Sequence, residues 1–217
     1  KKLNEKIEEL KDAIISSTQK LVKIKSVESK PEPGMPFGKG INEALEASLQ
    51  IADLLDFKVN NVDGYTGTAE IGEGEEVLGI LTHLDVVPEG DNWSYPPYGA
   101  EIHDNKIYGR GALDNKGPTI ATLYAMKAVK ELGFDLNKKV RLILGTDEES
   151  GWEGLEYYQE KEELPERGFS PDASFPVIHA EKGIMIFNLN MNFSNLIDNL
   201  DGVNIKKIKG GNAHNMV

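Results

Sequence analysis

The stretch VLGILTHLDVV, residues 77–87, decides the fold. It is a nearly continuous apolar run that ends at Pro88, which is typical of a strand buried on both faces of a sheet. VRLILGT, residues 140–146, is a second run of this kind. Helical patterns separate and flank these strands. The sequence therefore predicts an α/β fold with a mixed, mainly parallel sheet flanked by helices.

The rest of the chain supplies the other expected elements. Apolar residues recur at helical spacing in four segments, residues 3–24, 41–52, 118–133 and 154–163. Two short strands are expected around the turn pair Asp63-Gly64, and residues 173–180 are expected to lead into a further strand.

The composition narrows the possible functions. The 217 residues carry a formal net charge of −12 and no cysteine, and no run approaches the roughly 20 apolar residues of a membrane-spanning helix. We therefore expect no nucleic-acid or membrane partner, no disulfide and no thiolate metal ligand. The charged, periodic N-terminus does not resemble a signal peptide, so a cytoplasmic location is expected.

The first polar cluster, His83-Leu84-Asp85, ends the first buried strand. Residues i and i+2 of a strand point to the same face, so the Asp85 carboxylate can accept a hydrogen bond from the His83 ring. Such a bond supports an imidazole that binds metal through its other nitrogen. A structural histidine at a strand end is the alternative.

The second cluster is GRGALDNKGP, residues 109–118, a glycine-rich loop before a predicted helix. A dinucleotide-binding loop would need G-x-G-x-x-G, but Asp114 occupies the third glycine position. That interpretation is rejected. A glycine-rich loop in which an Asp caps the helix is the simpler alternative to a ligand site.

The third cluster, TDEESG at residues 146–151, ends the second buried strand. Consecutive acids are costly there unless they are paired, protonated or bound to metal. Neighbouring residues of an extended segment point different ways, so one of Glu148 and Glu149 can bind metal while the other faces the substrate. A solvated turn with a helix cap is the alternative.

The clusters are more informative together than singly. With Asp172, they bring a histidine and several acids to the ends of separate strands, where ligands of open α/β sheets collect. Mixed histidine and carboxylate ligands favour Zn²⁺, Mn²⁺ or Co²⁺ over Ca²⁺.

The motifs resemble one family. THLDVVPEGDNWSYPPYGAEIHDNKIYGRGALDNKGP and GTDEESGWEG are similar to the two signatures of the dinuclear zinc peptidases related to aminoacylase, carnosinase and carboxypeptidase G. SPDASFPVIHAEKG resembles the bacterial dipeptidase V branch. The resemblance implies two bound metal ions, held by His83, Asp114, Glu149 and Asp172, with Asp114 bridging them.

The resemblance also implies other roles. Glu148 would be the general base and Asp85 would orient His83. The Asp114–Asn115 peptide bond would be cis, and the Asn115 side chain is not expected to be a ligand. His103 and His179 are interpreted as structural, the latter within a strand.

Two domains are implied. Residues 1–187 would form the N-terminal part of a catalytic domain, and residues 188–217 would begin a lid whose Asn215 helps bind substrate. In the family the chain then returns to supply a last histidine ligand, so the sequence is expected to be a truncated form.

The implied function is hydrolysis of dipeptides by metal-activated water, with a small peptide as partner and a monomer slightly favoured. The alternatives are an N-acyl-amino-acid deacylase or an aminotripeptidase with the same metal site, and a metal-binding module without turnover.

Overall fold

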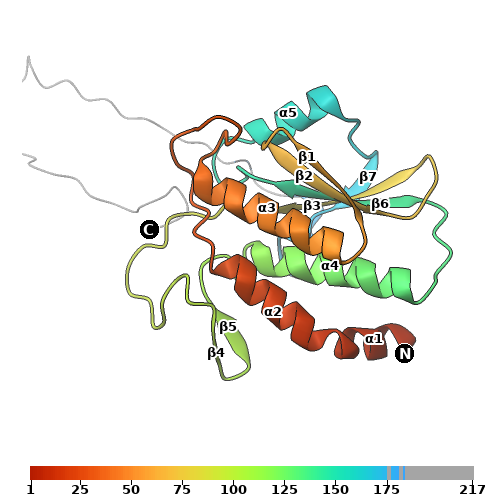
Figure 1. The fold of residues 1–217 in the computed structure, drawn as a ribbon, viewed down its shortest axis with the longest axis horizontal. Helices are drawn as coiled ribbons and strands as arrows, with labels where there is room; N and C mark the ends of the chain where they lie inside the picture. Colours follow the sequence, from red (N-terminus) through yellow and green to blue (C-terminus); the bar gives the residue numbers. More distant parts are fainter. Residues whose placement is uncertain (175–176, 181–182, 184–217) are drawn as a thin grey trace, which may run out of the picture. The chain divides into compact units, whose positions relative to one another are not determined.

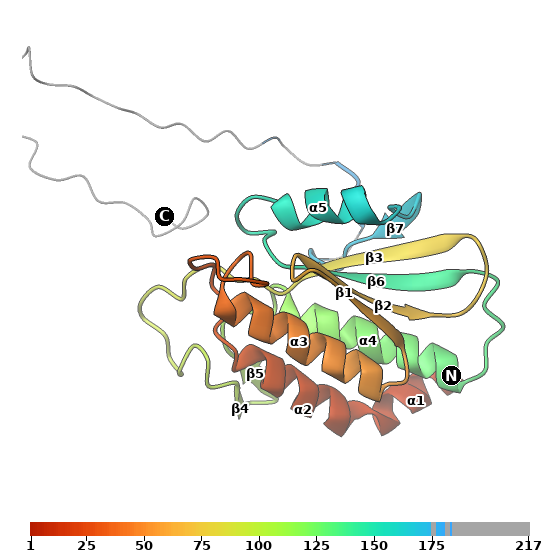
Figure 2. The same cartoon turned by 45° about the horizontal axis from the view of Figure 1, so that its top comes forward.

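The computed structural model describes residues 1–174, 177–180 and 183, and one compact unit runs from Lys1 to Ala173. In this unit a sheet carries four helices on one face and one on the other (Figures 1 and 2). The predicted α/β class is confirmed. No helix of the described part of the chain is long and apolar enough to cross a membrane.

The main sheet has five strands in the order β1-β2-β6-β3-β7. Its pairs β1–β2 and β2–β6 are antiparallel, whereas β6–β3 and β3–β7 are parallel, so four of the five strands run in the same direction. This is the mixed, mainly parallel sheet predicted from the sequence. The strands are β1 (Lys58–Val62), β2 (Thr66–Ile71), β3 (Val77–His83), β6 (Lys139–Gly145) and β7 (Arg167–Phe169).

The helices lie close to their predicted positions. They are α1 (Lys2–Glu9), α2 (Lys11–Val22), α3 (Lys39–Leu54), α4 (Lys116–Glu131) and α5 (Glu153–Lys161). The single predicted N-terminal helix is divided at Leu10, although Ile14 N–H still donates to the Leu10 carbonyl. The apolar stripe was continuous, so periodicity alone could not locate this break.

Burial of apolar side chains on both sheet faces holds the unit together. The larger cluster packs α3 and α4 against the sheet and α2 against these two helices, and it includes Leu21, Leu45, Leu123 and Leu142, all fully buried. The smaller cluster, Val62, Ile143 and Tyr158, lies between the sheet and α5. Alternate residues of β6 therefore serve opposite faces, which explains why that strand is a continuous apolar run.

The first buried strand is shorter than its apolar run. β3 ends at His83, whereas residues 84–87 were predicted to continue it. Leu84 N–H still donates to the Gly145 carbonyl, but Val86 N–H donates to the carbonyl of Ser26, which follows α2. The run stays apolar because these residues remain buried after leaving the sheet, and the turn places Asp85 beside the strand end.

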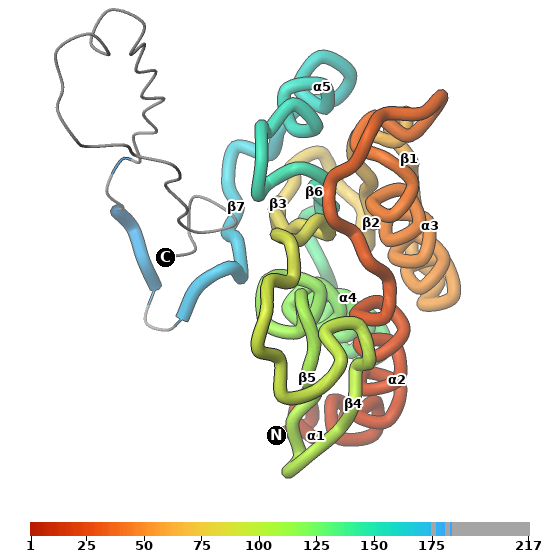
Figure 3. Tube along the Cα trace, turned by 90° about the vertical axis from the view of Figure 1, so that its left-hand side faces the viewer, coloured from red at the N-terminus to blue at the C-terminus, as the bar shows by residue number. Residues whose placement is uncertain are grey.

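Two elements were not predicted. The hairpin β4 (Glu101–His103) and β5 (Lys106–Tyr108) turns at Asp104 and Asn105, which both have positive φ. It lies next to α2, whose Gln19 side chain donates to the Ala100 carbonyl (Figure 3). The His103 ring stacks on Tyr95 at 3.8 Å, in agreement with a structural role. The other missed element, β7, is short and exposed.

The strand expected around His179 is not present among residues 177–180, and the His179 residue is exposed. Residues 188–217, the expected start of the lid, lie outside the described residues, and Asn215 is among them.

Candidate metal centre

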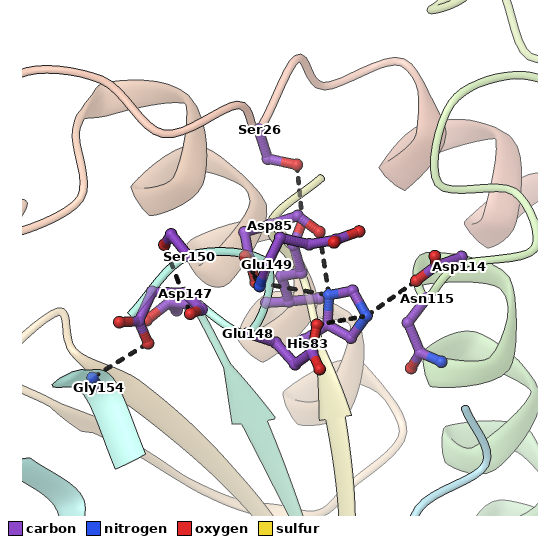
Figure 4. Close-up of polar contacts among 12 residues, drawn as sticks. Ser26, His83, Asp85, Asp114, Asn115, Asp147, Glu148, Glu149, Ser150 and Gly154 are labelled. Carbon is purple, nitrogen blue, oxygen red and sulfur yellow. Dashed lines mark hydrogen bonds and ion pairs between the residues drawn. The ribbon is translucent and has the colours of Figure 1, made fainter. Parts of the chain in front are cut away.

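The candidate centre forms where β3 and β6 end side by side. His83 is the last residue of β3 and pairs in register with Gly145, the last residue of β6. Glu148 and Glu149 follow β6, and their side chains lie around the His83 ring (Figure 4). Asp114 precedes α4 and Asp172 follows β7. Parallel strands thus bring residues distant in sequence to one edge of the sheet.

The distances show how closely these groups meet. His83 Nε2 lies 2.9 Å from Asp114 Oδ1, 3.4 Å from Asp172 Oδ2 and 3.9 Å from Glu148 Oε2. Ligand-type atoms of His83, Asp114 and Glu149 lie within 4.8 Å of one another, as do those of His83, Glu148 and Asp172. The structure therefore brings together the side chains of all four predicted ligands and of the predicted base.

The other nitrogen of the His83 ring faces Asp85. Nδ1 is 3.0 Å from the Asp85 carbonyl oxygen and 3.4 Å from its carboxylate Oδ1. The sequence led us to expect the carboxylate as the acceptor, but the shorter contact is to the carbonyl, because the chain turns after His83. With a proton on Nδ1, Nε2 is left to face the acids. Asp85 Oδ2 accepts from Glu149 N–H at 2.9 Å and so ties the two loops together.

Burial and the neighbouring carboxylates shift the pKa values of several groups in the candidate centre. Burial alone would lower the pKa of the His83 imidazole, but contacts with Asp114, Asp172 and Asp85 raise it to about 12. The hydrogen bond between His83 and Asp114 also lowers the pKa of the Asp114 carboxyl. Burial, followed by the charge of Asp114, raises the pKa of Glu149 to about 7. Burial also raises the pKa of Glu148. The carboxylates repel one another, so positive charge among them is favourable.

This donor set fits divalent metal ions. Hard carboxylate oxygens and one imidazole nitrogen are the ligands that Zn²⁺, Mn²⁺ and Co²⁺ accept. Two groups of three such residues, which share His83, each have the ligand-type atoms to hold a metal ion at this end of the strands. A bound cation would also offset the burial and the charge of Asp114, which together raise the pKa of Glu149.

The three acids of the third cluster, Asp147, Glu148 and Glu149, make different contacts. Asp147 is buried and its carboxylate accepts from the N–H groups of Glu153 and Gly154 at 2.7 and 3.0 Å, so it caps α5. Burial raises the pKa of Asp147 to about 6. Asp147 thus supports the helix start, as that alternative expected, but it is buried and not part of a solvated turn, while the two glutamates after it face the candidate centre (Figure 4).

The glycine-rich loop places the Asp114 side chain at the candidate centre and not at the start of α4. Asp114 does not cap α4, whose N-cap residue is Asn115. The Asp114–Asn115 peptide bond is cis, as the resemblance implied. A side chain at Gly117 would clash with the Ala112 carbonyl, so the tight turn needs a glycine there.

Sequence reasoning missed the role of Lys116. It is fully buried, and its ammonium donates to the Ile24 carbonyl at 2.6 Å, which fastens the loop to the chain after α2. Burial lowers the pKa of Lys116 to about 7. Its position directly before Gly117-Pro118, inside a tight turn, was the available signal.

The profile of Peptidase family M20/M25/M40 matches residues 79–192. That span is more than half of the chain. The chain belongs to this peptidase family. The resemblance inferred from the motifs is confirmed.

Individual relatives give the same result. The chain is 49% identical over 177 residues to "Putative dipeptidase YtjP" of Bacillus subtilis (strain 168), covering 81% of this chain and 38% of that protein. A relative of the same description in Staphylococcus aureus (strain USA300) is 42% identical over 217 residues, covering 98% of this chain and 46% of the relative. The chain thus spans less than half the length of these relatives.

Among solved structures, human carnosine dipeptidase 1 superposes with a TM-score of 0.67 at 25% identity, covering 80% of this chain and 41% of that one. The dipeptidase Dug1p of Saccharomyces cerevisiae superposes with a TM-score of 0.62 at 20% identity, which shows a shared fold.

Proposed function

We propose that the protein hydrolyses dipeptides at the centre formed by His83 and the surrounding acids, with two divalent metal ions as cofactors. The observation that carries the proposal is the convergence of His83 with Asp114, Asp172, Glu148 and Glu149 at the ends of parallel strands. Family membership and the dipeptidase names of the relatives support it.

Four residues would hold the metal ions. His83 and Asp172 would bind one ion, Glu149 would bind the other, and Asp114 would bridge the two. When bound, the ions supply Lewis-acid polarisation of the scissile carbonyl and lower the pKa of a water. Asp85 holds the His83 ring through Nδ1, so that Nε2 faces the centre and could bind an ion once its proton is lost.

Glu148 would be the general base. It would take the proton of the attacking water and deliver it to the leaving amine. The position of Glu148 supports this role, because its Oε2 lies 3.9 Å from His83 Nε2 and so faces the centre. The backbone N–H of Glu149 donates to Asp85, which fixes the loop at the residue proposed as the metal ligand.

Three further predictions complete the proposal: zinc as the metal, a cytoplasmic location, and a small peptide substrate whose binding involves Asn215 in the lid. The metal-binding module without turnover is the less favoured function, because a structural site has no use for a free glutamate beside its ligands.

The test is a substrate panel with the protein as it is expressed from its gene. The protein would be stripped with a chelator, then assayed with dipeptides, tripeptides and N-acetyl amino acids before and after addition of Zn²⁺ or Mn²⁺. Metal-restored hydrolysis that favours dipeptides is expected. A preference for tripeptides or N-acetyl amino acids would replace the proposed substrate class, and no hydrolysis with any metal would contradict the enzymatic function.

A further inference from the structure

The side chain of Asn115 does not cap the helix that begins after it. Asn115 is the N-cap residue of α4 and is fully buried. Asparagine favours this position because its side-chain oxygen accepts from the first N–H groups of a helix. Here the side chain makes no such capping bond. The helix start is instead supported by Thr119, whose N–H and hydroxyl both donate to the Asn115 carbonyl at 2.9 Å.

The amide of Asn115 is directed at the segment after β7. Nδ2 donates to Asp172 Oδ1 at 2.6 Å and to the Pro171 carbonyl at 3.2 Å. Both partners are acceptors, so the NH₂ group and not the amide oxygen must face them. Oδ1 of Asn115 is buried and has no partner within the part of the chain that the structure describes. The two Nδ2 bonds alone therefore set the orientation of the amide.

The two oxygens of the Asp172 carboxylate have different neighbours. While Oδ1 accepts from Asn115, Oδ2 lies 3.4 Å from His83 Nε2. Asp172 follows a short edge strand, and its side chain is partly buried, with a relative exposure of 28%. Groups that hydrogen-bond a metal ligand fix its direction and commonly change metal affinity 10- to 100-fold.

We infer that Asn115 is a positioning residue that fixes the Asp172 carboxylate for metal binding, a role that rests on the proposed function. The sequence suggested only that Asn115 is not itself a ligand. It acts through Asp172. An unprotonated carboxylate at residue 115 would remove this donor and place two acceptors against each other.

The test is a double-mutant cycle read by metal affinity rather than by activity. Zn²⁺ binding to the chelator-stripped protein, expressed from its gene, would be measured by competition with a chromogenic chelator for wild type, Asn115→Ala, Asp172→Ala and the double variant. Thr119→Ala is the matched control, because it removes a buried hydrogen bond from the same helix turn without touching Asp172.

We expect Asn115→Ala to weaken one Zn²⁺ binding event by about 10- to 100-fold, and the double variant to bind no more weakly than Asp172→Ala. Thr119→Ala should unfold at a lower temperature yet keep its affinity. Should Asn115→Ala fail to fold, Asn115→Asp, which keeps the shape and loses the donor, takes its place in the cycle.

The possible failures are distinguishable. Wild-type affinity in the Asn115 variant, or losses that simply add in the double variant, would overturn the positioning role alone. Unchanged affinity in Asp172→Ala would instead overturn the assignment of Asp172 as a ligand in the proposed function.

Discussion

Replacing Glu149 by Gln should stabilise the metal-free protein while it destroys metal binding. Burial and the charge of Asp114 raise the pKa of this carboxyl from 4.5 to about 7. Each pKa unit is worth about 1.4 kcal/mol, so the full difference corresponds to roughly 3 kcal/mol. The side chain is only half-buried, and solvent screening reduces the expected gain to about 1 kcal/mol.

The sign follows from proton linkage. A carboxyl whose pKa is raised in the folded state binds its proton more tightly there than in the unfolded chain. The folded state therefore loses stability as the pH rises from about 4.5 to about 7, and the loss is complete above that range. Wild type and Glu149→Gln should be equally stable near pH 4 and should differ by the full amount at pH 8.

Urea unfolding of the chelator-stripped proteins at the two pH values measures this difference. Glu43→Gln, at an exposed position of α3, is the matched control and should change little. Added Zn²⁺ at about 100 times its dissociation constant should stabilise wild type by about 2.7 kcal/mol, and Glu149→Gln by much less. A Glu149→Gln protein that is no more stable than wild type at pH 8 would refute the electrostatic reasoning.

Other positions test separate parts of the structure. Asp147→Ala should be less stable than Asp147→Asn by about 1–2 kcal/mol in thermal unfolding, because Asn keeps a cap acceptor for α5; equal stabilities would contradict the capping role. A hydrogen bond from Lys25 is the main cause that lowers the pKa of Glu89 to about 2, so its contribution is present above about pH 4.5 and is lost as the pH falls toward 2. In Glu89→Gln the free energy of unfolding should depend less on pH in that range. An unchanged pH dependence would argue against the pair of Glu89 and Lys25. Leu142→Ala, at a fully buried position in β6, should cost about 2–5 kcal/mol in urea unfolding, and a cost below 1 kcal/mol would contradict its place in the core.

Periodicity was enough to predict the elements that are buried on a face or on both faces. β3 and β6 carry continuous apolar runs because side chains on each face are covered, and α3 and α4 bury one stripe each. β7 was missed because its three residues are exposed at the sheet edge and leave no apolar pattern. The departure of residues 84–87 from the sheet was not predicted because these residues stay buried.

The candidate centre was predictable to the extent that strand ends determine position. Residue types and their placement after buried strands indicated that His83, Asp114 and the two glutamates converge. The direction of individual side chains was not predictable. The carbonyl of Asp85 rather than its carboxylate makes the shorter contact with His83, and Asn115 turns from its helix to Asp172. Both depend on local turns that sequence spacing does not specify.

The central claim is that Glu148 moves the proton while its neighbours hold the metal. The most direct measurement pairs metal content with kcat for Glu148→Ala in the protein expressed from its gene. Removal of a general base should lower kcat for dipeptide hydrolysis by at least about 100-fold. We expect that loss with metal content near that of wild type. Loss of metal together with activity would contradict the account and exchange the roles of Glu148 and Glu149.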